Sequence, residues 1–461
     1  MEEKLGQGVQ KAPKTKKEKL GAPESRRWPI KSEFTPEMLA EMEKILPSKL
    51  NRVVAISLAG CIHCGLCSEA CHYTASIPED KTLLPAYKAD RFRKWYKYRF
   101  DWAAKVFPSF VGAQPLTKEL ADDMYDKLWG ACTMCRRCTF NCPMGVDYGM
   151  LVRAARGIMT QVGRVPKHLQ ETIDAHYNNG NNMAVPRDEF VETIEWIEEE
   201  LQSEDGCENF KIPVDKKGAQ YFLTLNPREP KYYPLTIQAT AKVLNAAGVD
   251  FTISSRYWDL TNYAMFSGID PDAKLFAQWQ YEDVLRLECE YLLSGECGHG
   301  YRALRWEMPN WLGGVPFKIT SMMELMADLI QKGRITLDKS VHAGKRFTYH
   351  DSCNIARSGG VLEEPRIIVR AAVDDFVEME HNREDSFCCG GGGGALAMPE
   401  FSERRIRAGK IKAEEIRATS ANVVLQSCHN CTDQLKEIVD HYGIKAKVMN
   451  LAELVAPALI L

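Results

Sequence analysis

Eight of the 16 cysteines in this chain of 461 residues form two short quartets with the same spacing, C-x2-C-x2-C-x3-C. The members are Cys61, Cys64, Cys67 and Cys71, then Cys132, Cys135, Cys138 and Cys142, which Pro143 follows. Three thiolates separated by two residues wrap one [4Fe-4S] cube, and the fourth ligates the other cube. The spacing therefore predicts two [4Fe-4S] cubane clusters, the first held by Cys61, Cys64, Cys67 and Cys142, and the second by Cys132, Cys135, Cys138 and Cys71.

Other uses of so many cysteines fit this pattern less well. A structural zinc site predicts isolated C-x2-C pairs rather than two quartets. A disulfide framework is typical of small secreted chains, whereas the N-terminus here mixes Lys, Glu, Gly and Pro and lacks the apolar core of a secretory signal. His72 replaces the proline that usually follows the first quartet, and we expect it at the surface or beside the site rather than as a ligand.

A second cysteine constellation occupies the C-terminal part, with the spacing C-x34-C-C-x38-C-x2-C, and its members are Cys353, Cys388, Cys389, Cys428 and Cys431. Each element follows a predicted strand, and loops from the carboxyl ends of parallel strands meet at one edge of a sheet. Two adjacent cysteines do not suit the corners of one ordinary cube, so the pattern indicates either an unusual cluster or a redox-active thiol pair.

Small and titratable residues flank these five cysteines. The glycines after Cys389, among them Gly390, Gly391 and Gly392, carry no side chain and let backbone N–H groups approach cluster sulfides or a sulfur substrate. His350, Asp351 and His429 are candidates for proton delivery or for hydrogen bonds to the site. A phosphate-binding loop is disfavoured because no Lys-Ser or Lys-Thr pair follows the glycines.

The elements that must position these residues change character along the chain. Helical periodicity covers Phe34 to Leu50 and Lys167 to Gln202, and the acidic stretch 195–205 is typical of a domain edge. Beyond it, β-rich runs alternate with helical segments, which is typical of β-α units. The runs are Gln220 to Leu225, Asp250 to Ser254, Tyr291 to Ser294, Phe347 to His350, Val373 to Met379 and Asn422 to Gln426.

We therefore expect an α+β multidomain fold, in which an α-helical ferredoxin-like domain precedes two related α/β lobes. The predicted limits are a disordered or partner-binding tail (1–33), the helical domain (34–202) with an insert (72–131), a linker (203–217), and the lobes (218–342 and 343–461). The relation between the lobes rests on 290–304 and 422–435, which place Cys297 opposite Cys428 and Gly300 opposite Cys431. Cys297 and His299 then either line the active cleft or are remnants of a lost site.

The insert contains a basic and aromatic segment, 91–107, with Phe92, Trp95, Tyr96 and Phe100 near one helical face. Such a helix either lies at a membrane interface or on a membrane subunit, or packs its aromatic stripe on the domain's own core. The net charge of −3 gives no field suited to nucleic acid. No stretch of the sequence approaches the roughly 18 apolar residues that span a bilayer.

The two quartets together with C…CCG…CxxC resemble the CCG-domain iron–sulfur subunits of the heterodisulfide reductase family. The resemblance implies that Cys353, Cys388, Cys389, Cys428 and Cys431 hold one catalytic noncubane [4Fe-4S] cluster. The first lobe departs from the double-CCG pattern, since no cysteine follows its first strand, none lies in 257–270, and only Cys297 remains of the final motif. A second noncubane cluster is therefore not expected.

This resemblance also implies a function. We expect an iron–sulfur oxidoreductase subunit, cytoplasmic and peripheral on the inner face of the cell membrane, that exchanges electrons with a membrane cytochrome b subunit (DsrM-like) and other complex subunits. Its substrate would be the disulfide or trisulfide of a small sulfur-carrier protein (DsrC-like) or another disulfide. The alternative is a non-catalytic electron relay for a flavin dehydrogenase of the glycolate oxidase or glycerol-3-phosphate dehydrogenase type.

Overall fold

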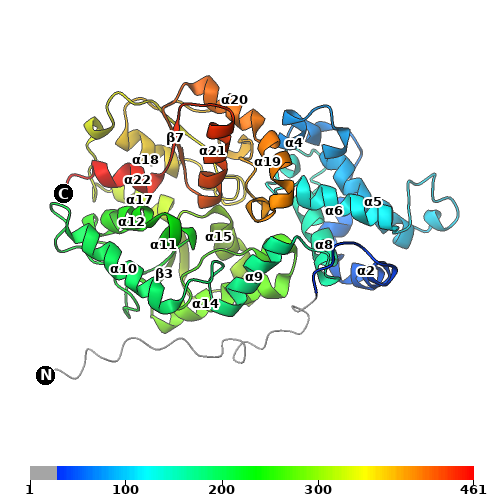
Figure 1. Ribbon diagram of the computed structural model, residues 1–461, viewed down its shortest axis with the longest axis horizontal. Coiled ribbons are helices and arrows are strands. Elements are labelled where there is room, and N and C mark those ends of the chain that lie inside the picture. The colour runs from blue at the N-terminus through cyan, green and yellow to red at the C-terminus, as the bar shows by residue number, and fades with distance from the viewer. Residues whose placement is uncertain (1–28) are drawn as a thin grey trace.

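The computed structural model describes residues 29–461, so most of the tail predicted for residues 1–33 lies outside the described residues. The chain forms an elongated molecule, with a helical N-terminal part at one end and two α/β units at the other (Figure 1). Helix α8 (Tyr148–Gln161) is buried along almost its whole length at the centre of the helical part. It packs against α2 (Pro36–Lys49), α3 (Arg52–Ala59), α5 (Pro85–Phe100) and α6 (Lys118–Gly130).

Local sequence explains where these helices begin. Thr35, Asn51 and Thr117 each accept a hydrogen bond from a backbone N–H of the first turn of α2, α3 and α6 respectively. Side-chain oxygens at this position satisfy donors that a helix leaves without an internal partner. The short helices α4 (His72–Ser76) and α7 (Arg137–Phe140) lie inside or directly after the two cysteine quartets.

The first α/β unit contains a parallel sheet of four strands in the order β2 (Phe251–Ile253), β1 (Tyr221–Thr224), β3 (Tyr291–Ser294), β4 (Lys318–Ser321). The strands are short and mostly buried, as is usual for parallel sheets covered on both faces. Their neighbours in sequence are the helices α12 (Pro234–Ala246), α14 (Asp270–Arg286) and α17 (Met322–Gln331).

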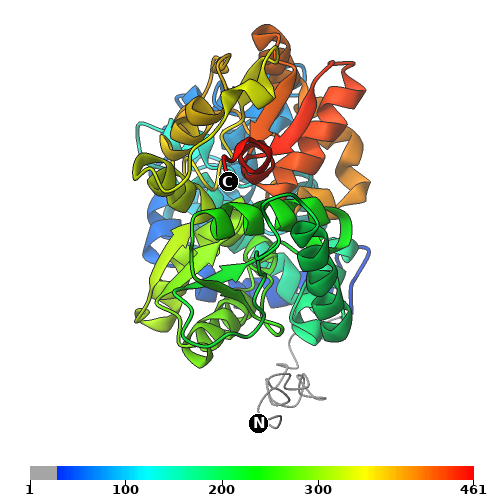
Figure 2. The same cartoon turned by 90° about the vertical axis from the view of Figure 1, so that its left-hand side faces the viewer.

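The second α/β unit has a parallel sheet of three strands in the order β5 (Phe347–Tyr349), β6 (Val423–Gln426), β7 (Lys447–Asn450). Its helices are α18 (Glu364–Ala372), α19 (Ser402–Ala408), α20 (Lys410–Thr419), α21 (His429–His441) and α22 (Leu451–Val455). Helices α17 and α18, and likewise α12 and α22, pack across the two units, which lie one above the other in Figure 2. One hydrophobic core therefore extends through both.

Two features differ from the sequence-based expectation. Residues 373–379 do not form a strand: they make a single parallel bridge, Phe347 to Phe376, and the exposed Asp374 and Asp375 interrupt the apolar run. Helix α10 (Arg187–Gln202), which was expected in the helical domain, packs on α12, and its Phe190 stacks on Trp258 of the first unit. The domain limits themselves stay a prediction.

Helix α9 (Lys167–Asn179) is the one long α-helix of the described residues not yet mentioned. The other α-helices are short connections: α11 (Arg228–Tyr232), α13 (Ala264–Ser267), α15 (Gly298–Arg302) and α16 (Met308–Leu312). The expected fold class, a helical domain followed by α/β units, is confirmed. Among the described residues no helix combines the length and the apolar character that crossing a membrane requires.

Candidate iron–sulfur sites

Two cavities in the helical part collect the cysteines of the quartets. Cys61, Cys64, Cys67 and Cys142 line one cavity, together with Tyr148. Cys71, Cys132, Cys135 and Cys138 line the other, together with Lys88. In both cases the fourth cysteine of one quartet joins the first three of the other. This is the exchange that the spacing predicts, although the ligand sets themselves stay a prediction.

The two quartets also share an unusual backbone pattern. His63 and Met134 occupy the same position in the two quartets and both have positive φ, 55° and 54°. Gly65 and Arg136 are the next matched pair, with φ of 86° and 62°. A positive φ is uncommon for residues other than glycine. The repeated strain bends each quartet around its cavity.

Buried cations provide a test of whether an anionic group fits the second cavity. Lys88 is buried, and its Nζ donates to the carbonyl of Ala131 (2.6 Å) and lies 3.9 Å from Cys71 Sγ. Arg156 is fully buried and donates to carbonyl oxygens, among them those of Leu128, Cys132 and Gly393. Within residues 29–461 neither cation has a carboxylate partner within 4.0 Å, and burial lowers the pKa of Arg156 to about 10. Buried charges are normally paired, so these residues fit a cluster with thiolate ligands and net negative charge.

The five cysteines of the C-terminal constellation converge, and all five are buried. Cys353, Cys389, Cys428 and Cys431 line one cavity, and the sulfurs of Cys389 and Cys431 are 3.4 Å apart. Cys353 follows β5 and Cys428 is the N-cap of α21 after β6, whereas no strand precedes Cys388 and Cys389. Cys388 does not line this cavity, but its neighbouring thiol raises the pKa of Cys353. A set of five converging cysteines fits an iron–sulfur group here as well.

Glycines bring backbone donors to these sulfurs. The N–H of Gly390 donates to Cys388 Sγ and that of Gly391 to Cys389 Sγ, both over 3.4 Å, and Gly392 lines the cavity. At Gly393, where φ is +64°, a Cβ atom would come within 2.6 Å of the Thr133 backbone. The glycine segment therefore reaches the cysteines through its backbone N–H groups and, at Gly393, packs against the second quartet where a side chain would not fit.

The second cubane cavity and the C-terminal cysteine site meet directly. Cys135 Sγ and Cys388 Sγ belong, with a ring nitrogen of His72, to a group of atoms within 4.8 Å of one another. Thr133 Oγ1 donates to Cys388 Sγ over 3.3 Å. His72 is buried, and neither of its ring nitrogens has a hydrogen-bond partner in the described part of the protein. Of the two positions expected for His72, at the surface or beside the site, the structure shows the one beside the site.

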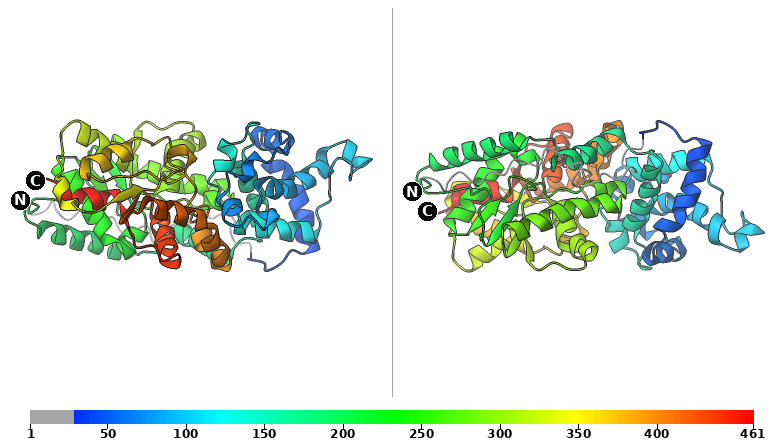
Figure 3. Two further views of the ribbon diagram at one scale, coloured as in Figure 1. Left: turned by 90° about the horizontal axis from the view of Figure 1, so that it is seen from above. Right: turned by 90° about the horizontal axis from the view of Figure 1, so that it is seen from below.

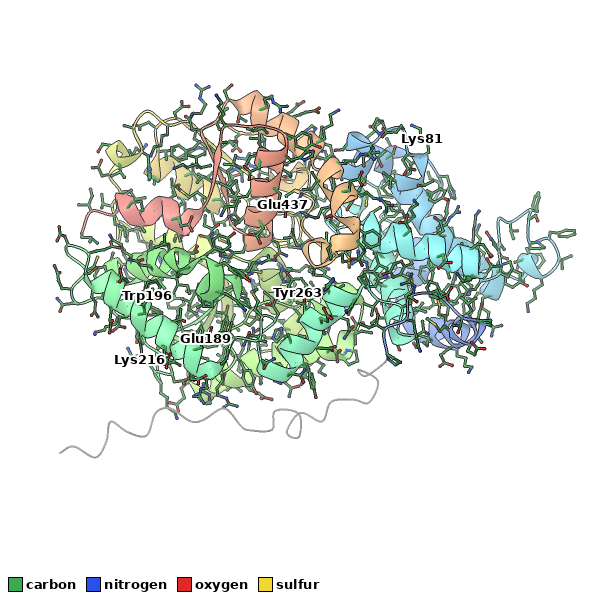
Figure 4. The ribbon with its side chains drawn as sticks, viewed as in Figure 1. Lys81, Glu189, Trp196, Lys216, Tyr263 and Glu437 are labelled. Carbon is green, nitrogen blue, oxygen red and sulfur yellow. The ribbon has the colours of Figure 1, made fainter. Side chains whose placement is uncertain are left out.

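The first α/β unit also contributes to the C-terminal site. Cys297 is the N-cap residue of α15 as Cys428 is of α21, and the neighbouring thiol of Cys428 helps burial to raise the pKa of Cys297. His299 lines the cavity; its Nδ1 lies 3.5 Å from Cys297 Sγ, and its Nε2 is buried without a partner among residues 29–461. Burial lowers the pKa of His299 to about 4, so the ring is neutral at physiological pH. Tyr263, which packs on His299, marks this junction in Figure 4. The sequence left open whether Cys297 and His299 line the cleft; His299 lines this cavity, whereas Cys297 lies behind it, beside His299.

The other three residues that flank the C-terminal cysteines, His350, His429 and Asp351, have different surroundings. His350 lies within 4.8 Å of Cys389 and Cys431, and burial lowers its pKa to about 3, so it is neutral and suited to a hydrogen bond. Burial disfavours the charged form of His429, but the carboxylate of Glu229, 2.8 Å from Nε2, raises its pKa overall. Asp351 forms a buried two-oxygen ion pair with Arg366 at 2.6 Å. Asp351 therefore holds the loop of Cys353 and is not directed at the cavity.

Comparisons with known proteins agree with both groups of cysteines. Residues 57–146 match the 4Fe-4S dicluster domain, and residues 347–436 match the Cysteine-rich domain CCG. The chain carries both domains. Together they contain all thirteen cysteines of the two quartets and the C-terminal constellation.

Several iron–sulfur proteins are similar along most of the chain. The Hdr-like menaquinol oxidoreductase iron-sulfur subunit of Archaeoglobus profundus is 27% identical, over 95% of this chain and 85% of that protein. A subunit of the dihydromethanophenazine:CoB–CoM heterodisulfide reductase of Methanosarcina barkeri is 26% identical, over 91% of this chain and 99% of that protein. The EtfAB:quinone oxidoreductase of Syntrophomonas wolfei is 26% identical, over 88% of this chain and 58% of that protein. The chain is thus related to iron–sulfur subunits of oxidoreductases.

Proposed function

We propose that this chain is the single-CCG iron–sulfur subunit, of the DsrK type, of a membrane-associated complex of dissimilatory sulfur metabolism. It exchanges electrons between a membrane cytochrome b subunit (DsrM-like) and a disulfide or trisulfide, such as that of a DsrC-like carrier. The observation that carries the proposal is the contact between Cys135 and Cys388. This contact joins the part of the chain that holds the two quartets, here called the dicluster part, to the five cysteines of the C-terminal constellation, here called the CCG site. The similarity to a heterodisulfide reductase subunit supports a sulfur substrate.

The cavities support a set of ligands for each of three groups. Cys61, Cys64, Cys67 and Cys142 would hold one cubane, and Cys71, Cys132, Cys135 and Cys138 the other. Cys353, Cys388, Cys389, Cys428 and Cys431 would hold a noncubane [4Fe-4S] cluster. When bound, cubanes supply one-electron transfer, and the CCG-type cluster supplies iron sites for sulfur chemistry.

The chain's own residues prepare the CCG site in two ways. All five cysteines are buried, which keeps bulk water from the sulfurs. Ser352 Oγ donates to Cys431 Sγ over 3.4 Å, and backbone N–H groups of Gly390 and Gly391 donate to Cys388 and Cys389. Hydrogen bonds to sulfur tune the potential of an iron–sulfur site. His299 Nε2 is a buried ring nitrogen at the cavity without a partner in the described chain, which suits a hydrogen bond to a substrate sulfur.

Reduction of a disulfide consumes two electrons and two protons and yields two thiols. In the proposed complex the electrons come from the cytochrome b partner, and the protons come from solvent. Cys64 is exposed, and the exposed apolar side chains of Ile62, Leu66, Phe140 and Met144 accompany it. An apolar surface beside an exposed cluster ligand suits the docking of this partner on the inner face of the membrane.

Substitution of the adjacent cysteines tests the proposal. In the reconstituted protein with a reduced viologen dye as electron donor, Cys388→Ser or Cys389→Ser should abolish disulfide reduction and leave the paramagnetic signals of both cubanes. Cys207→Ser is the matched control, because Cys207 is buried away from all three sites. Undiminished turnover in either adjacent-cysteine variant would overturn the assignment.

A second candidate function is an electron relay without a substrate of its own, serving a flavin dehydrogenase of the glycolate oxidase or glycerol-3-phosphate dehydrogenase type. The similarity to an EtfAB:quinone oxidoreductase supports it. A relay predicts dye-to-quinone electron transfer with no response of the CCG site to thiols. The presence of His299 at the cavity favours the catalytic proposal, because a relay has no use for a ring nitrogen there that lacks a partner among residues 29–461.

A further inference from the structure

The insert (72–131) contains a loop that projects from the molecule between α5 and α6. The loop spans residues 100–113 and follows α5, and it extends beyond every other described element at one end of the molecule in both views of Figure 3. The first part of α5 is anchored: Phe92 and Trp95 are buried, and Trp95 Nε1 donates to Glu43 at 2.7 Å. The first half of the basic and aromatic segment (91–107) therefore packs on the domain's own core, and only its second half is available for a membrane or a membrane subunit.

Large apolar side chains cover the loop. Trp102 is 80% exposed and Phe110 is 91% exposed, and Phe100, Val106 and Phe107 are exposed beside them. Isolated exposed apolar residues are common, but here five lie within one short loop, and concentrations of exposed apolar side chains mark interaction sites. Water is therefore an unfavourable neighbour for the tip of the loop.

The loop has a defined conformation that presents these side chains. Phe107 N donates to Ala103 O (2.8 Å), Ala113 N to Pro108 O (2.8 Å) and Gln114 N to Lys94 O (3.1 Å). Lys97 Nζ also donates to Val111 O at 3.0 Å and ties the returning part of the loop to α5. Internal hydrogen bonds satisfy the backbone, so insertion of the tip into an apolar medium would not expose many unpaired polar groups.

Charge decides between possible partners. Residues 94–113 contain four basic side chains, Lys94, Lys97, Arg99 and Lys105, and a single acidic one, Asp101. The half-buried Asp101 accepts a hydrogen bond at Oδ1 from the N–H of Ala103 within the loop. Aromatic side chains at the tip of a loop, with basic side chains around its base, match the interface of a bilayer that contains anionic lipid.

We propose that the loop 100–113 inserts Trp102, Phe107 and Phe110 into the interface of an anionic lipid bilayer and so anchors the chain directly, in addition to any partner subunit. The anchor is independent of electron transfer. It also orients the molecule, because the first half of α5, through Ala86, Lys88 and Ala89, lines both cubane cavities. The dicluster part would face the membrane, and the CCG site would lie farther from it.

Flotation with vesicles tests the proposal on the full chain. Vesicles of phosphatidylcholine with about 30% phosphatidylglycerol, and of phosphatidylcholine alone, are compared for wild type and for the triple variant Trp102→Ser, Phe107→Ser, Phe110→Ser. Trp196→Ser is the matched control, since Trp196 is 48% exposed and lies at the opposite end of the molecule (Figure 4). The lysines of residues 1–28 are the same in all variants, so the comparison isolates the loop.

The wild type and Trp196→Ser should float with the anionic vesicles, and the triple variant should bind at least about tenfold less. The single variant Phe110→Ser, at the most exposed position, should bind less with unchanged iron content, which separates lost insertion from misfolding. The wild type should bind pure phosphatidylcholine only weakly. Equal binding of the triple variant, or no binding of the wild type to anionic vesicles, would overturn the proposal; in the second case the loop would be a contact for a protein partner.

Discussion

Cys135 Sγ and Cys388 Sγ lie within 4.8 Å of each other, although one belongs to the second quartet of the helical part and the other to the pair of adjacent cysteines in the last α/β unit. Thr133 and Gly393 pack at the same junction. A contact this short leaves no room for an intervening layer of protein between the two candidate ligands. Substitutions can test the junction, the charge of the second cavity and the fold around them separately.

The hydroxyl of Thr133 is expected to tune the CCG site. Thr133→Val removes the donor 3.3 Å from Cys388 Sγ while keeping the shape of the side chain. A lost hydrogen bond to sulfur makes reduction less favourable, so the midpoint potential assigned to the CCG site should become more negative. A redox titration followed by paramagnetic resonance measures it. Thr133→Ser, which keeps the hydroxyl, should behave as wild type, and an unchanged potential in Thr133→Val would contradict the assigned contact.

Gly393 is expected to be essential for the packing of the glycine segment. Gly393→Ala places a Cβ 2.6 Å from the Thr133 backbone at a φ of +64°. Gly360→Ala is the control, because φ is also positive, +84°, but no atom lies within 4 Å of the added Cβ. The control should lose about 1 kcal/mol of unfolding free energy from the backbone conformation alone. Gly393→Ala should lose clearly more, together with iron, as denaturant titration and iron analysis would show; equal losses would refute the packing argument.

The effect of Lys88→Met on stability should have opposite signs with and without an anionic group in the second cavity. In apo protein, Lys88→Met removes a buried ammonium without a carboxylate partner among the described residues, so stability should stay the same or rise. In the iron-loaded protein the same change removes a favourable charge, so stability should fall and the potential of one cubane should become more negative. Thermal unfolding of both forms measures the effect. The same direction of change in both forms would count against an anionic cluster beside Lys88.

Asp259 is expected to make stability depend on pH. Burial raises the pKa of its carboxyl from 3.8 to about 7, against hydrogen bonds from Thr261 and the N–H of Asn182. A raised acid pKa means that the folded state binds the proton more tightly, so the stabilisation is complete below about pH 4 and is lost as pH rises through 7. At about 1.36 kcal/mol per pKa unit the loss is up to about 4 kcal/mol. Denaturant titrations at about pH 5 and about pH 8 should show roughly 2.7 kcal/mol of this loss in wild type but not in Asp259→Asn; the same fall in both would contradict the assignment.

The cysteine motifs could be predicted from sequence because their chemistry is encoded in local spacing. The exchange of Cys71 and Cys142 between cavities follows from the same spacing rule. The strand expected at 373–379 was wrong, because Val373 and Val377 suggest a strand but the exposed Asp374 and Asp375 leave only a bridge. The helix α10 was assigned by its position in the chain, whereas its apolar face packs on the first α/β unit.

The residues that sequence missed act through tertiary contacts. Lys88 and Arg156 lie on helices among other basic residues, and only the fold shows that they are buried beside cysteines without carboxylate partners in the described chain. His72 offered a local signal, since it replaces an expected proline, but its contact with Cys388 depends on the packing of distant segments. Cys297 was found through the repeat between the lobes, and its contact with Cys428 required the structure.

The central claim is that the CCG site binds a thiol substrate and exchanges electrons with the dicluster part. Electron paramagnetic resonance of the oxidised, iron-loaded protein, recorded with and without the thiol form of the substrate, tests it most directly. We predict a signal that appears only with the thiol in wild type and is absent in Cys388→Ser. If only the ordinary signals of reduced cubanes appear, with or without the thiol, the catalytic account is contradicted and the chain is a relay.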